Sequence, residues 1–94
     1  MKEFRYRPSA NAPYDRQGAV WFTVRRYHDL PKEKKQQVDK LLYRAAGHNW
    51  EALLAYIITD KTAKEVAKEH YIGSTTTLTN AIKKLMEIFP DDLL

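Results

Sequence analysis

One short segment in the C-terminal half limits most strongly what this chain can fold into. Thr62 and Glu65 match a capping box, in which the hydroxyl accepts an amide hydrogen bond and the carboxylate reaches back to the cap amide. Ser74 is a second candidate helix cap. Between the two caps, Ile72 is expected to be the apolar plug of a turn and Gly73 the residue that tolerates positive φ. Two short helices joined by a tight turn are therefore predicted.

Apolar residues recur at helical spacing through most of the remaining chain, which predicts an all-α fold of about five helices. One helix is expected over residues 31–46, with Gly47 as its left-handed stop, and another from Trp50, with Asn49 as its cap. The last helix should end at Pro90. Its inward-facing side chains are predicted to be Leu78, Ala81, Ile82, Leu85 and Phe89.

Residues 15–30 fit two periodicities. Val20, Trp21 and Val24 fall on one helical stripe, whereas Val20, Phe22 and Val24 alternate as they would in a strand. The chain offers no second strand to pair with this one, and a lone strand cannot satisfy its backbone hydrogen bonds. We therefore predict a helix here, with the strand as the alternative.

Size and composition indicate a single small domain. The 94 residues leave room for one modest core. Residues 1–14, which have mixed polarity and contain two prolines, are expected to form an N-terminal arm or tail, residues 15–90 the helical domain, and residues 91–94 a short acidic tail. No apolar run reaches the roughly eighteen residues that a membrane span needs, and the N-terminus lacks a signal-peptide pattern. We expect a cytoplasmic protein without membrane contact.

Charge and residue types narrow the classes of function. The net charge of +4 favours acidic partners, among which nucleic acid is the commonest. Cysteine is absent from the sequence, which removes disulfides, thiolate metal sites and cysteine nucleophiles together. The three histidines are not spaced with one another or with carboxylates as a zinc site on one helix requires. We expect no enzyme activity, cofactor, metal or small-molecule substrate.

The turn segment carries a resemblance to known proteins. Residues 72–80 place an apolar residue, a serine cap, two variable positions, a threonine, an aliphatic and a small polar residue in succession, which resembles the turn and recognition-helix start of many bacterial and phage repressors. Tyr71 departs from this pattern because it stands where glycine is usual, and Gly73 looks like one extra turn residue. With residues 19–27, the segment resembles small helix-turn-helix proteins of phages and integrated mobile elements. The resemblance implies double-stranded DNA binding in a transcriptional role.

The outward face of the last helix follows from its spacing. If Leu78 and Ile82 face inward, small polar side chains and two lysines are left outside. Hydroxyls and amides can bond base edges or phosphates, asparagine can pair bidentately with adenine, and lysines suit backbone phosphates. Two arginines near the end of the first predicted helix are also expected to face outward. The predicted DNA-binding residues are Thr75, Thr76, Thr79, Asn80, Lys83, Lys84, Arg25 and Arg26.

Assembly and alternative functions complete the hypothesis. A single small reading helix usually needs dimerisation to reach useful specificity, so we expect a homodimer with Trp21 or Phe22 near its interface. Apolar side chains in excess of one small core support this expectation, namely Phe4, Tyr6, Trp21, Phe22, Leu93 and Leu94. Three alternatives stay open: a protein-interaction module without DNA contact, a DNA-recognition subunit of a larger phage complex, and a threonine cluster that only caps a solvated helix.

Overall fold

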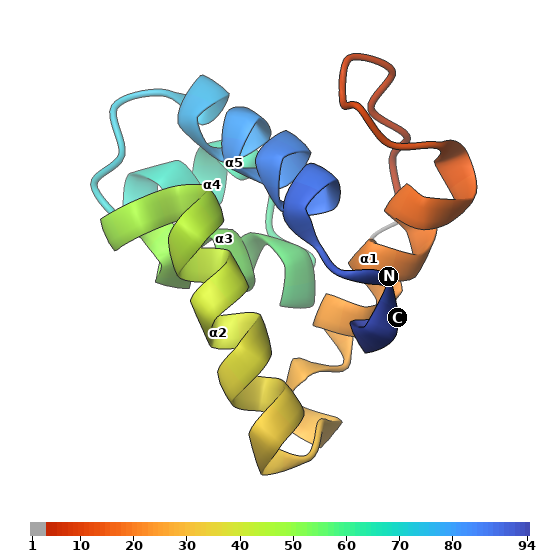
Figure 1. Cartoon of the computed structure of the whole chain (residues 1–94). Coiled ribbons are helices and arrows are strands. Elements are labelled where there is room, and N and C mark those ends of the chain that lie inside the picture. Colours follow the sequence, from red (N-terminus) through yellow and green to blue (C-terminus); the bar gives the residue numbers. More distant parts are fainter. Residues whose placement is uncertain (1–3) are drawn as a thin grey trace.

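The computed structural model describes residues 4–94, and its regular secondary structure is all helical (Figure 1). The first three residues of the predicted arm lie outside the described residues. The helices are α1 Tyr14–Arg25, α2 Lys32–Ala46, α3 Trp50–Ile58, α4 Ala63–Glu69 and α5 Thr75–Ile88, with short 3-10 turns at Tyr27–Asp29, Gly47–Asn49 and Asp91–Leu93. No strand occurs in residues 4–94, so the all-α prediction is confirmed. The choice of helix over strand for residues 15–30 is confirmed as well.

The main core lies where α2 packs against α5 and α3, with α1 closing it from the far side. Figure 1 shows α4 near the beginning of α5 and α1 near its end. The predicted inward side chains of α5 are all buried. All of them except Leu78 belong to one cluster with apolar side chains of the other helices that are also almost completely buried: Val20, Val24, Val38, Leu42, Leu53 and Ile57.

The ends of the helices follow local rules with one exception. Gly47 ends α2 at φ 59° and ψ −132°, a conformation that disfavours side chains, so the predicted glycine stop is confirmed. Pro31 precedes α2, and α5 ends at Ile88, directly before Phe89 and Pro90. Asn49 occupies the predicted N-cap position of α3, but its side chain makes no cap hydrogen bond, because the 3-10 turn of residues 47–49 runs directly into the helix.

The segment before α1 is packed onto the domain. Gln17 on α1 is fully buried, and both polar atoms of its side-chain amide bind the backbone of this segment. Its Oε1 accepts from Arg7 N at 2.8 Å, and its Nε2 donates to Ala12 O at 2.8 Å. The backbone amide of Asn11 donates to Glu87 Oε2 on α5 at 2.8 Å. Residues 7–12 are therefore fixed against α1 and the second half of α5.

The surplus of apolar side chains is smaller than the sequence indicates. Trp21 is only 3% exposed and packs edge-on against Tyr56 of α3, and Leu93 of the last turn is buried as well. Of the two residues expected near a dimer interface, Trp21 is covered by its own domain and Phe22 is exposed. Tyr6, Tyr14 and Phe22 remain exposed, and we call these three residues the aromatic patch.

Candidate nucleic-acid interface

α4 begins at the capping box that the sequence predicts. Glu65 N donates to Thr62 Oγ1 at 3.2 Å, and Thr62 N donates to Glu65 Oε1 at 3.2 Å. Two of the amides that a helix N-terminus leaves unpaired are satisfied in this way. The helix then turns Val66 and Ala67 inward, which fixes its orientation towards α5.

The turn between α4 and α5 differs from the prediction. Tyr71, rather than Gly73, takes the left-handed conformation, with φ 58°. The side chain of Tyr71 is 97% exposed, so nothing packs against the ring to stabilise this conformation. Gly73 has ordinary backbone, and a Cβ atom there would meet nothing within 4 Å. The end of α4 determines that Tyr71 is the left-handed residue, so the prediction of positive φ at Gly73 is wrong.

A second, smaller core joins the two helices. Leu78 of α5 is completely buried and packs with Val66 and Ala67 of α4 and with Ala52 of α3. Ile72 of the turn packs against the same cluster, which confirms its expected role as an apolar plug. The angle of α4 to α5 is thus fixed by apolar contacts on one side of the pair.

The first turns of α5 are polar and open to solvent. Ser74 caps the helix as predicted, accepting from Thr76 N at 3.2 Å. Of the residues predicted to face outward, Thr75, Thr76, Asn80 and Lys84 are exposed, while Thr79 and Lys83 are half-buried at the flank. The hydroxyl of Thr79 donates to the Thr75 carbonyl at 3.2 Å, which leaves it only as an acceptor for a ligand.

The positive charges of the two lysines on this face are available to an anionic ligand. Within residues 4–94, neither Lys83 nor Lys84 forms an ion pair. Thr77 is also exposed on α5, although it is not among the predicted DNA-binding residues. Glu87 shares the face farther along, where its carboxylate accepts from the N-terminal segment.

The two arginines at the end of α1 behave differently. The guanidinium of Arg25 donates from Nη1 to the carbonyl of Ile57 at 2.8 Å and lies 3.8 Å from Asp60, and its side chain is only 14% exposed. The expectation that it faces outward is wrong, because it satisfies a carbonyl in the last turn of α3. Arg26 is exposed as expected. Arg25 is thus bound to the end of α3 and to the residues that follow it.

Two other kinds of site receive no support from the described chain. Among residues 4–94, no group of three or more histidine, aspartate or glutamate side chains is arranged to hold a metal ion. Within the same residues, no helix has both the length and the apolar character needed to cross a membrane.

Comparison of the chain with protein-family models, with curated proteins and with solved structures finds no match. The case for a function consequently rests on the geometry of the α4–α5 pair and on the chemistry of its exposed side chains.

Proposed function

We propose that α4 and α5 form the helix-turn-helix of a five-helix domain that binds double-stranded DNA sequence-specifically, as a transcriptional regulator of a phage-like or mobile element. One observation carries the proposal. The apolar contacts of Val66, Ala67, Ile72 and Leu78 all lie on one side of the pair, and the opposite side of the first turns of α5 is exposed, uncharged and rich in hydroxyls. A helix with that surface can enter a major groove without burying unpaired charge.

The roles of the side chains follow from their exposure. Thr76 and Asn80 are one turn apart on the exposed face, so both can reach base edges when α5 enters the groove. Thr75 and the cap Ser74 sit at the helix beginning, where backbone amides and hydroxyls suit phosphate oxygens. Lys84 lies farther along α5 and can contact the backbone as the helix leaves the groove. Arg26 remains a candidate for a more distant phosphate.

A homodimer is part of the proposal because two half-sites multiply the discrimination of one reading helix. The aromatic patch supports it. Tyr6 and Tyr14 have ring centroids 5.7 Å apart, and Phe22 lies beside them through Phe4, so their exposed rings form one continuous surface. The alternatives are a DNA-recognition subunit of a larger phage complex, for which the same patch would be the contact, and an interaction module that does not bind DNA.

The deciding experiment is a titration of fluorescent duplexes drawn from phage-like and host sequences at several salt concentrations. We expect the logarithm of the association constant to fall linearly with the logarithm of the salt concentration, with a slope of about −0.9 for each phosphate neutralised. One duplex should be preferred over random DNA by about a thousandfold or more. Absence of binding to every duplex at low salt would reject the DNA-binding function and favour the interaction module.

A further inference from the structure

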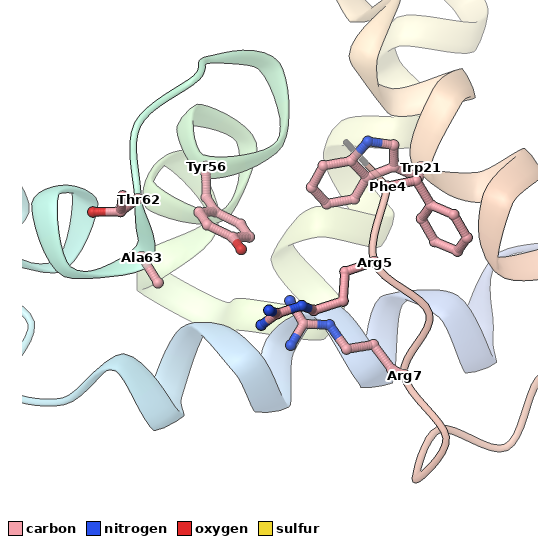
Figure 2. Close-up of a pocket in the computed structure, with 7 residues that line it drawn as sticks. All are labelled: Phe4, Arg5, Arg7, Trp21, Tyr56, Thr62 and Ala63. Carbon is pink, nitrogen blue, oxygen red and sulfur yellow. The ribbon is translucent and has the colours of Figure 1, made fainter. Parts of the chain in front are cut away.

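A cavity of about 530 Å³ lies beside the N-terminal segment. Its walls come from the N-terminal segment, from α1, from α3 and from the beginning of α4, where Thr62 and Ala63 border it (Figure 2). The aromatic wall consists of Trp21 and Tyr56, whose ring centroids are 6.1 Å apart. Elements far apart in sequence thus enclose one space.

Two arginines of the N-terminal segment reach into this cavity. Arg5 and Arg7 are two residues apart on a segment without helix or turn, and Figure 2 shows both guanidinium groups extending the same way, towards Tyr56 and Ala63. Arg7 is held in place through its backbone, because Gln17 accepts from its amide and donates to its carbonyl at 2.9 Å. These two bonds fix the backbone of Arg7 at the edge of the cavity.

The positive charge in the cavity has no carboxylate counterpart in the described chain. Within residues 4–94, neither Arg5 nor Arg7 forms an ion pair, and Arg7 Nε is buried without a hydrogen-bond partner. Glu65, the acid at the beginning of α4, accepts hydrogen bonds from Thr62, and Asp60 lies near Arg25. Bringing two like charges into one cavity and burying a donor unpaired both cost free energy.

We propose that this cavity is a phosphate-binding site, in which Arg5 and Arg7 are the two residues that bind the phosphate. Guanidinium groups present paired N–H donors that match phosphate oxygens. A singly charged phosphate would offset one of the two positive charges and a doubly charged one both, and either could satisfy Arg7 Nε. The phosphate can belong to a small phosphate compound or to the backbone of bound DNA. The second source rests on the proposed function, and the first is independent of it.

The first arm of the test uses inorganic phosphate without DNA. Thermal unfolding of the wild type is followed as phosphate replaces chloride at constant ionic strength, beside the variant Arg5→Gln/Arg7→Gln and the control Lys34→Gln/Lys40→Gln on the exposed face of α2. A ligand that binds only the folded state raises the melting temperature. We expect a rise of several degrees in the wild type and in the control variant, and its loss in the arginine variant.

A measurement on the unaltered protein guards against misfolding of the arginine variant. In ¹H–¹⁵N spectra, the side-chain Nε–H signals of Arg5 and Arg7 should move with added phosphate, while that of Arg44, exposed on α2, should stay in place. Equal movement of all three signals, or a melting temperature that rises equally in the arginine variant, would overturn the site for free phosphate.

The second arm titrates duplex DNA with the same three proteins. Weaker binding and a salt slope shallower by about two in the arginine variant alone would assign the site to a DNA phosphate. Unchanged duplex affinity together with a lost phosphate response would assign it to small phosphate compounds. No phosphate response in the wild type and unchanged duplex affinity in the variant would together reject the site. If the wild type binds no duplex, the proposed function fails and the first arm alone decides this inference.

Discussion

The backbone amide of Ile72 donates a 2.8 Å hydrogen bond to the carbonyl oxygen of Ala67, and this bond closes the end of α4. The neighbouring amide of Tyr71 donates to Lys68 O at 3.4 Å. The two bonds together form a Schellman motif, in which the residue between the helix cap and the outer donor must be left-handed. Because Ile72 also packs on the α4–α5 cluster, the backbone end of α4 and the contact with α5 are formed by the same residue.

Tyr71 should therefore be replaceable by glycine with a gain in stability. The left-handed conformation costs a residue with a Cβ atom about 1–2 kcal/mol in steric energy. Glycine avoids this cost, but it loses more conformational entropy on folding than tyrosine does, which offsets part of the gain. We expect Tyr71→Gly to raise the free energy of unfolding by roughly 0.5–1 kcal/mol, measured by urea denaturation. As a matched control, Gly73→Ala should be neutral or slightly stabilising, because Gly73 has no positive φ and its surroundings are open. A lower urea midpoint for Tyr71→Gly would contradict the assigned turn.

Local relations explain why much of this region could be predicted from sequence. The capping box of Thr62 and Glu65, the Ser74 cap and the inward stripe of α5 depend on residues three or four positions apart. Assigning positive φ to Gly73 failed because glycine permits that conformation without requiring it. The hydrogen bonds that end α4, with His70 as its cap, place the next residue, Tyr71, in the left-handed region.

Long-range relations account for what the sequence did not predict. Arg25 turns away from solvent because a carbonyl on α3 lies within reach, and Trp21 is covered by Tyr56, which is distant in sequence. The cavity with Arg5 and Arg7 likewise depends on Gln17 fixing the N-terminal segment. A period along one helix gives the direction of a side chain and does not identify the element it meets.

Leu78 should be the most costly single truncation in the α4–α5 pair. It is completely buried at the centre of the smaller core, so Leu78→Ala removes apolar contacts and leaves a cavity. We expect a loss of about 2–5 kcal/mol in the free energy of unfolding, measured by urea denaturation. The adjacent Thr77 is exposed, and Thr77→Ala should change stability by no more than about 0.5 kcal/mol. Equal effects of the two changes would mean that α5 is rotated from the orientation described here.

Tyr27 should make stability depend on pH in the alkaline range. Burial of the phenol, the hydrogen bond it donates to Asp39 and the negative charge of that carboxylate raise the pKa of Tyr27 from 10.0 to about 12. Between these two values the folded protein keeps a proton that the unfolded chain has released, so the contribution to stability is complete below pH 10 and is lost towards pH 12.

The variant Tyr27→Phe isolates this effect, because phenylalanine keeps the ring and lacks the ionisable hydroxyl. We expect the wild type to exceed Tyr27→Phe in the free energy of unfolding at pH 9, and the difference to shrink as the pH rises through the window of 10 to 12. Urea denaturation of both proteins at each pH provides the measurement. A difference that stays constant across this range would contradict the raised pKa.

The aromatic patch should determine assembly. Phe22 is 52% exposed on α1, and the ring of Phe4 contacts both Phe22 and Tyr14. Phe22 is therefore the residue whose removal should weaken a homodimer most. We expect the wild type to sediment as a dimer and Phe22→Ser to dissociate at least about tenfold more readily, which corresponds to roughly 1.4 kcal/mol. Tyr43→Ser, on the exposed face of α2, is the control and should leave assembly unchanged. A wild type that is monomeric both free and on DNA would favour the subunit of a larger complex.

Asn80 and Lys84 should have separable effects on DNA binding. Both are exposed on α5, one turn apart, but an amide can discriminate between base edges whereas an ammonium group contacts phosphate without regard to sequence. We expect Asn80→Ala to lose roughly 1–3 kcal/mol on the preferred duplex and little on random DNA. Lys84→Ala should weaken both duplexes alike and make the salt slope shallower by about one. Competition titrations against the preferred duplex, random DNA and duplexes with single base-pair changes measure both effects. If both variants lose affinity equally on every duplex, α5 contacts only the backbone, and the reading surface must lie on another element.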